Sequence, residues 1–188
     1  AAQDCMAGTI ENNFIADASL YGIRIDSSRD SGFVPLQPGV ARHLPTLNNG
    51  RLVPGVVVTN NVISASGTAG ILFSGDDNSE GNTTPLASVP YGRIINNTIF
   101  GGVDDQDNPQ GIGIEVEDNA APTLLNNLLA SLESGVLVGG SSVVDGLGNS
   151  RTVVGYSAFH NVTTQVTAAV PATNSITLAT DPFVNAER

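Results

Sequence analysis

The 188-residue chain has no lysine, no tryptophan, a single cysteine and no long hydrophobic run. Without lysine, Schiff-base catalysis is excluded, and a net charge of −11 disfavours binding to nucleic acid. Because Cys5 cannot form an internal disulfide, it is expected as a small buried residue. The apolar runs fall far short of the ~20 residues of a membrane span, so none is expected. What remains is an acidic protein, and we expect residues 1–188 to form a single domain.

The chain does contain a repeat in two parts. The first part, Asn-Asn followed one residue later by Ile or Leu, occurs at residues 12–15, 60–63, 96–99 and 126–129. The second part, Gly-apolar-x-apolar, follows each of these at residues 22–25, 70–73, 113–116 and 135–138. Four paired matches in the same order indicate a repeating structural unit.

The spacing of the repeats separates a constant unit from insertions. The bare unit is about 23 residues long, whereas successive Asn-Asn pairs lie 48, 36 and 30 residues apart. The excess falls on segments rich in Gly, Pro, Asp and Asn, near residues 27–54, 75–90 and 103–110, which we expect to be loops. The first of these is long enough to be a further irregular coil. Residues 163–188 are expected to add strands or extended cover over the last coil.

This period, made of short alternating strands with no helical pattern, predicts a right-handed parallel β-helix, a solenoid of about 5–6 coils. Alternate apolar residues such as Ile71 and Phe73 are expected to point into a continuous core. Asparagine tolerates the left-handed backbone conformation of a sharp corner, and stacked asparagines can form a hydrogen-bonded ladder. We therefore expect the Asn-Asn pairs to be corners, with a degenerate final turn over residues 153–161.

The combination of Asn-Asn-x-Ile with Gly-Ile-x-Ile resembles the repeats of the pectin-lyase-like right-handed β-helices of polysaccharide lyases and large bacterial surface proteins. The resemblance covers residues 10–138, and residues 181–184 are similar to a segment that often ends such repeats in long secreted proteins. It implies the β-helix fold and a secreted or cell-surface location. Because enzymes and non-enzymes share this fold, function has to be argued from a site.

Enzymes of this family act on polysaccharides through the outward side chains of one strand column. The third residue of each Gly-apolar-x-apolar strand should point outward, which gives Arg24, Leu72, Glu115 and Leu137, followed by Asp26, Ser74, Glu117 and Gly139. Outward positions are about 7 Å apart along a strand, which suits the two carboxylates of an inverting glycosidase. If the chain is a polysaccharide lyase or a glycoside hydrolase, the candidate catalytic residues are Glu115, Glu117, Arg24 and Asp26.

The alternative interpretation is a solvated strand face with scattered charge. The calcium cluster and base of the lyases, and the aspartate and histidine motifs of the galacturonases, have no complete match, so the family's catalytic residues cannot be carried over. His43 and His160 lie far apart in the sequence, and both are expected to be structural.

Two acidic segments have oxygen-rich side chains at spacings that suit Ca²⁺. Asp76, Asn78 and Glu80 form an Asp-x-Asn-x-Glu-Gly pattern, although the position of the bidentate glutamate of an EF-hand is Ala87. Asp105 and Asp107 belong to a second cluster that could lie on the same side of the solenoid. The alternative is that these acidic loops serve solubility.

The leading hypothesis is a non-catalytic structural or adhesive module of a secreted or cell-surface protein. Its partners would be further copies of itself, in an oligomer or a filament, or further coils of a longer chain, because an open parallel stack exposes strand edges at its ends. The alternative is a carbohydrate-active enzyme or carbohydrate-binding module acting on polysaccharide. The absence of tryptophan and the few other aromatic residues weigh against sugar subsites.

Overall fold

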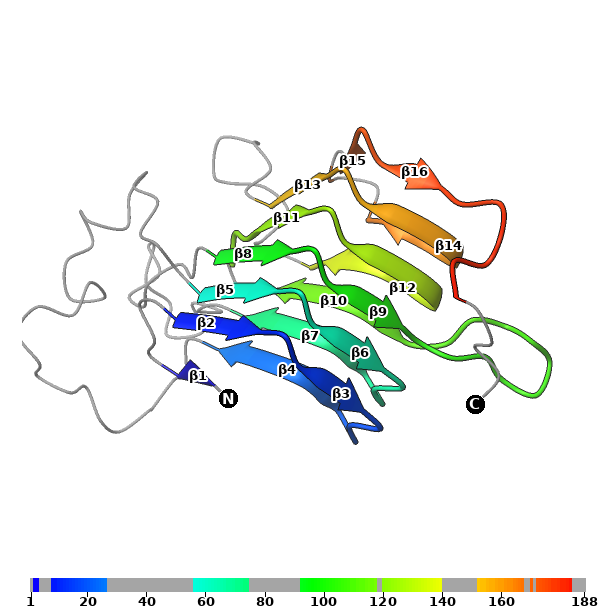
Figure 1. Cartoon of the computed structure of the whole chain (residues 1–188), viewed down its shortest axis with the longest axis horizontal. Coiled ribbons are helices and arrows are strands. Elements are labelled where there is room, and N and C mark those ends of the chain that lie inside the picture. The colour runs from blue at the N-terminus through cyan, green and yellow to red at the C-terminus, as the bar shows by residue number, and fades with distance from the viewer. Residues whose placement is uncertain are drawn as a thin grey trace, which may run out of the picture.

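The computed structural model describes residues 2–3, 8–26, 56–74, 92–117, 120–139, 152–167, 170 and 172–183. All the regular structure in these residues is β-strand, and the named strands pair only in parallel. The strands form a solenoid-like stack of two sheets (Figure 1). The expected all-β class is therefore confirmed. Within the described part of the chain, no helix is long and apolar enough to cross a membrane.

The smaller sheet has six strands, each from a successive pass of the chain through the stack. They are β2 (Gly8–Glu11), β5 (Val56–Thr59), β8 (Gly92–Ile95), β11 (Thr123–Leu125), β13 (Val153–Gly155) and β15 (Ala172–Thr173).

The larger sheet has ten strands, because each pass turns a corner and enters it. Strands that follow the corner directly are β3 (Phe14–Ala16), β6 (Val62–Ser64), β9 (Thr98–Phe100), β12 (Leu128–Val138), β14 (Ala158–Val166) and β16 (Ile176–Thr177). The remaining strands are β1 (Ala2–Gln3), β4 (Tyr21–Asp26), β7 (Ala69–Ser74) and β10 (Ile112–Glu117). Strand β12 is long enough to pair with both β9 and β10, which joins the two columns into one sheet.

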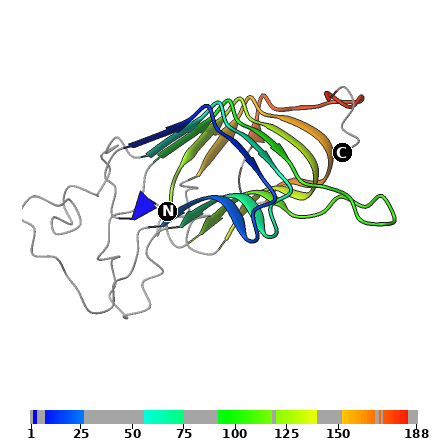
Figure 2. The same ribbon diagram turned by 60° about the horizontal axis from the view of Figure 1, so that its bottom comes forward.

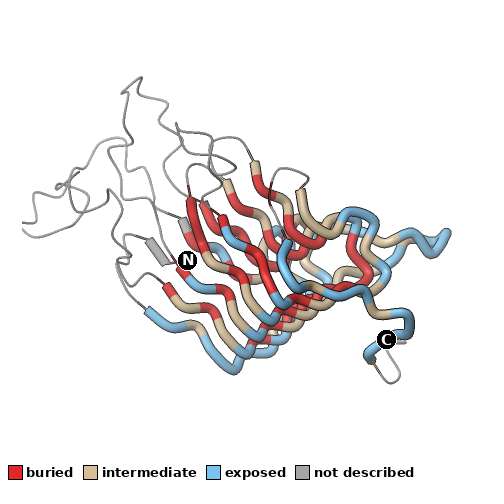
Figure 3. The backbone as a smooth tube through the Cα atoms, turned by 90° about the horizontal axis from the view of Figure 1, so that it is seen from above, coloured by how far each residue is buried: buried red, intermediate tan, exposed pale blue. Residues whose placement is uncertain are grey.

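The hydrophobic core consists of columns of aliphatic residues stacked from pass to pass. One column faces inward from the smaller sheet: Ile10, Val58, Ile94, Leu124, Val154 and Ala172. A second faces inward from the larger sheet: Ile15, Ile63, Ile99, Leu129, Phe159 and Thr177. The middle members of both columns are almost fully buried, and the buried positions recur from pass to pass in Figure 3. Period-two alternation thus has the predicted effect.

Each Asn-Asn pair forms the corner between the two sheets, and its two residues have different roles. The first residue takes the left-handed conformation, with φ of 57° at Asn12 and 54° at Asn60, which asparagine tolerates better than most residues. The second residues form the asparagine ladder, which consists of Asn13, Asn61, Asn97 and Asn127. The predicted corners and ladder are both confirmed.

The buried ladder asparagines bond to both neighbouring passes. At Asn61, Asn97 and Asn127, Oδ1 accepts from the pass before, and Nδ2 donates to a carbonyl of that pass. At Asn13, Asn61 and Asn97, Nδ2 also donates to the next Oδ1. In the second pass, Oδ1 of Asn97 accepts bonds from the backbone N–H of Asn61 (3.1 Å) and from its Nδ2 (3.0 Å). Nδ2 of Asn61 also donates to the carbonyl of Ile10 in the preceding pass, at 2.9 Å. Beyond Asn127, Ser157 and Ser175 continue the chain of bonds with their hydroxyl oxygens. The amide groups of the buried asparagines are thereby satisfied.

Glycines stand where the two columns of the larger sheet approach each other closely. A Cβ atom on Gly70 would lie 2.6 Å from the side chain of Ile99 and 2.8 Å from the carbonyl oxygen of Gly113. A Cβ atom on Gly113 would meet the side chain of Leu129 at 2.7 Å and the carbonyl of Gly135 at 2.6 Å. The repeated glycine therefore lets the aliphatic column pack against the neighbouring strand.

Two departures from expectation concern the ends of the repeat. Residues 153–161, expected as the final turn, form the fifth corner at Tyr156 and Ser157, and a further pass with β15 and β16 follows. After it, residues 178–183 run back beside the larger sheet (Figure 1). There the Phe183 ring meets the Phe100 ring edge-on, with 5.6 Å between the ring centres. We call residues 178–183 the C-terminal strap.

Only one of the three expected insertions lies among the described residues. Residues 27–54 and 75–90 lie outside them, as do Cys5 and His43. Residues 103–110 project from the stack as a narrow loop (Figure 2), closed by an antiparallel bridge between Val103 and Pro109.

Candidate functional site

The predicted outward column of the larger sheet is aligned by the backbone pairing. Arg24, Leu72, Glu115 and Leu137 are register partners on β4, β7, β10 and β12. Asp26, Ser74 and Glu117 align at the next outward position. Parallel stacking therefore brings Arg24, Glu115 and Glu117 onto one face, although they come from passes far apart in the sequence. The side chain of Asp26 lies outside the described residues.

This face is not the evenly solvated strip that simple alternation predicts. Arg24 is exposed and Glu115 is partly buried, but Leu72 between them is only 2% exposed and Ser74 is 5% exposed. Adjacent strands lie about 4.8 Å apart, so long side chains on β4 and β10 flank the leucine on both sides. Leu72, which interrupts the column of charged residues, thus places an apolar surface between Arg24 and Glu115.

Burial sets the electrostatics of this face. It raises the pKa of the Glu115 carboxyl, because the partly desolvated site disfavours the ionised form. Burial also raises the pKa of Tyr21, the charges of Glu115 and Glu117 raise it further, and the Arg24 charge opposes them. The Arg24 guanidinium carbon lies 5.9 Å from the centre of the Tyr21 ring, within cation–π range. We call Tyr21, Arg24, Glu115 and Glu117 the outer-face cluster.

The candidate calcium ligands are not brought together among the described residues. Asp76, Asn78 and Glu80 lie outside them, and Asp105 and Asp107 are exposed on the projecting loop. No group of three or more His, Cys, Asp or Glu side chains with metal-binding geometry occurs in the described part of the chain.

The acidic residue that organises the projecting loop is Asp104, which the sequence interpretation did not single out. Its Oδ1 accepts hydrogen bonds from the backbone N–H groups of Gln106 (2.8 Å) and Asn108 (2.9 Å), and Oδ2 accepts from Nδ2 of Asn108 (3.0 Å). These bonds favour the carboxylate and lower the pKa of Asp104. The sequence signal for this role is an Asp at the start of a turn, because an aspartate side chain readily accepts a hydrogen bond from the backbone two residues later.

His160 is held by the C-terminal strap, since its Nδ1 lies 3.2 Å from the carbonyl oxygen of Leu178. This contact fits the structural role expected for it. It involves a backbone group and places no catalytic partner beside the imidazole.

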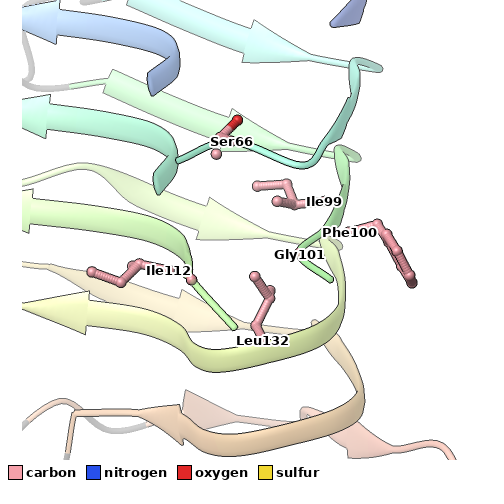
Figure 4. A pocket seen from close by; sticks show the side chains of 8 residues that line it. Ser66, Ile99, Phe100, Gly101, Ile112 and Leu132 are labelled. Carbon is pink, nitrogen blue, oxygen red and sulfur yellow. The ribbon is translucent and has the colours of Figure 1, made fainter. Parts of the chain in front are cut away.

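A small cavity lies inside the turn between the two columns of the larger sheet, lined by Ser66, Ile99, Ile112 and Leu132 among others (Figure 4). Its volume of about 10 Å³ is close to the space that one water molecule needs. The buried hydroxyl of Ser66 in its lining has no hydrogen-bond partner among the described residues. The cavity is far smaller than a site for a sugar or a cofactor.

Comparison with protein-family models, with curated proteins and with solved structures finds no match for this chain.

Proposed function

We propose that the chain is a right-handed parallel β-helix of the pectin-lyase-like kind and a non-catalytic structural or adhesive module of a secreted or cell-surface protein. The observation that carries the proposal is how the repeated residues are used. The ladder asparagines, the close-approach glycines and the aliphatic columns all join one pass to the next. A chain whose repeated residues serve stacking is suited to continuing that stack with further coils or further copies.

An exposed apolar column supports the adhesive part of this proposal. Phe14, Val62 and Ile176 are 76%, 42% and 58% exposed, and they belong to one outward column of the larger sheet. Between Val62 and Ile176 the column runs through Thr98, Leu128 and Ala158, which are partly buried. Exposed apolar side chains at the two ends of such a column are a surface for protein contact.

The test is light scattering coupled to size exclusion over a range of protein concentrations, with calcium and then with chelator. We expect the mass to rise with concentration, because the exposed apolar side chains of Phe14, Val62 and Ile176 can contact a second copy. Loss of the larger species with chelator would assign calcium to the acidic loops. A monomer at every concentration, together with turnover of a polysaccharide, would overturn the proposal.

The second candidate is a carbohydrate-active enzyme or carbohydrate-binding module, favoured by the outer-face cluster. A carboxyl group with a raised pKa suits a general acid, and a tyrosine beside an arginine and carboxylates offers a ring and hydrogen-bonding groups to a sugar. The variant Glu115→Gln should abolish any cleavage detected on a polysaccharide panel. Glu133→Gln, at an exposed position of β12, is the matched control.

A further inference from the structure

The first pass of the stack forms an edge whose residues are of the types found in the core but are only partly buried. Strands β2 and β3 are the terminal strands of the two sheet orders, each paired on one side only. Their inward residues Ile10 and Ile15 are only partly buried, whereas their equivalents Val58 and Ile63 in the next pass are 0% and 1% exposed. We call β2, the Asn12–Asn13 corner and β3 the N-terminal edge.

The asparagine ladder is unfinished at this edge. Nδ2 of Asn13 donates to Oδ1 of Asn61 (2.9 Å) and to the carbonyl of Glu11 (3.0 Å). In the next pass, Nδ2 of Asn61 makes the two corresponding bonds and a third, to the carbonyl of Ile10 in the pass before it. Oδ1 of Asn13 accepts no hydrogen bond from the described residues, whereas Oδ1 of Asn61 accepts two. The acceptor Oδ1 of Asn13 is therefore left without a partner among the described residues, and one of the two Nδ2 hydrogens of Asn13 could be shared with a further carbonyl, as occurs at Asn61.

A third column of the stack already extends beyond this edge. Strand β1 pairs in parallel with β4, with Ala2 opposite Ile25, and so holds the position that a preceding pass would give its Gly-apolar strand. Among the described residues, the positions beside β2 and β3 have no strand of that preceding pass.

We propose that the N-terminal edge is a docking site for a parallel strand–corner–strand segment that carries asparagine at the ladder position. The backbone N–H and Nδ2 of that asparagine would donate to Oδ1 of Asn13. A carbonyl three residues earlier in the segment would accept from Nδ2 of Asn13, as Ile10 does for Asn61. Branched aliphatic residues of the segment would cover Ile10 and Ile15. The proposal rests on the proposed function and names the chemistry of its partner.

The last pass of a second copy is a poorer occupant of this site. Its ladder residue is Ser175 and its inward residues are Ala172 and Thr177. Ser175 could give its backbone N–H to Oδ1 of Asn13, but it has no side-chain amide for the second bond. Alanine and threonine offer little apolar surface to Ile10 and Ile15.

The probe is a fluorescent peptide with the sequence of residues 56–64 of this chain, which contains one strand, the Asn60–Asn61 corner and the next strand. The matched control peptide carries Asn61→Ala. Fluorescence anisotropy with the intact chain should show saturable binding of the first peptide, and binding of the control roughly tenfold weaker. Hydrogen exchange with bound peptide should show added protection at residues 8–16 and none at residues 172–177.

Variants of the protein separate the ladder from general edge pairing. Asn13→Ala should remove the preference for the asparagine peptide. Asn13→Ser should restore part of the affinity for both peptides, because the Ser157 hydroxyl oxygen accepts the backbone N–H of Asn127 at the fifth corner. Ser175→Ala, at the opposite edge, should leave binding unchanged. Circular dichroism confirms that each variant is folded.

Three outcomes would overturn the proposal: no saturable binding, equal binding of both peptides, or protection confined to residues 172–177. The proposed structural function fails by a different result, polysaccharide turnover that Glu115→Gln abolishes, which leaves the peptide measurements unaffected.

Discussion

The two ends of the stack are built from different residues at equivalent positions. The first pass has Ile10, Asn13 and Ile15 where the last pass has Ala172, Ser175 and Thr177. The first set belongs to the interior of such a stack, and the second set is small or polar and tolerates water. The comparison indicates that the end with β15 and β16 is finished by its own composition, whereas the end with β2 and β3 retains the residues of a continuing core.

The sharpest test of this difference is to truncate two side chains of the same inward column, one in the buried middle of the stack and one in its last pass. Leu129→Ala removes a fully buried side chain in the fourth pass and should lower the free energy of unfolding by about 3 to 4 kcal/mol, because a cavity remains. Thr177→Ala, in the same column at the exposed last pass, should change it by no more than about 0.5 kcal/mol. Urea denaturation measures both. Equal losses would show that the last pass is part of the core.

Substitutions in the ladder should also cost more stability in the middle of the stack than in its last pass, with smaller losses than in the core. Asn97→Ala removes the bonds that Nδ2 donates to Val58, Ile95 and Asn127. It also removes the acceptor of the backbone N–H and Nδ2 of Asn61, so buried donors and acceptors are left unpaired and we expect a loss of about 3 kcal/mol. Ser175→Ala removes one acceptor at the edge and should cost less than about 1 kcal/mol. Urea midpoints of the two variants provide the measurement. A loss at Asn97 as small as that at Ser175 would contradict the assigned role of the ladder.

The C-terminal strap gives a further difference between the two ends of the stack, because it connects the last pass to the third pass. Phe183→Ala removes the edge-on ring contact with Phe100, and we expect a loss of about 1 kcal/mol. Exchange of the Leu178 amide, which donates to the carbonyl of Phe159 at 2.7 Å, should become faster. Pro182→Ala, which leaves both rings in place, is the control. Unchanged exchange would mean that the strap is held by its other contacts.

The smallest effect concerns the outer-face cluster, which extends from β4 of the first pass to β10 of the third. Because the pKa of Glu115 is raised in the folded state, the folded protein binds more protons than the unfolded chain between the two pKa values, and stability falls as pH rises through that window. Glu115→Gln should therefore stabilise the protein slightly at pH 7 and lose this advantage below the unfolded pKa. Thermal melts at several pH values test the sign. A destabilised variant at pH 7 would show that the carboxylate has a favourable partner.

The sequence is most informative where one residue has one structural task. Asn-Asn corners and glycine contacts repeat because the left-handed backbone, the ladder and the close approach each admit few residues. The sixth corner escapes the pattern, since Asn174 keeps the left-handed conformation while the ladder asparagine is replaced by Ser175. A hydroxyl can accept the same bond, but a motif built on asparagine pairs does not find it.

The candidate site was less predictable, because it depends on contacts across the sheet. Alternation places Leu72 outward, yet its burial depends on the neighbouring strands of other passes. The role of Asp104 depends on which amides the loop points toward it. Register alignment of Arg24 with Glu115 could be predicted, because the repeat itself fixes it.

The C-terminal strap also has a mechanical consequence. A pulling force applied to the end of the chain at Phe183 would first load the contact with Phe100, a residue of the third pass, and then the His160–Leu178 contact. Strands β15 and β16 could peel away only after these contacts break. A force applied at the other end would reach the β1–β4 pairing of only two register partners. Under tension the stack should therefore unravel from its first pass toward its last.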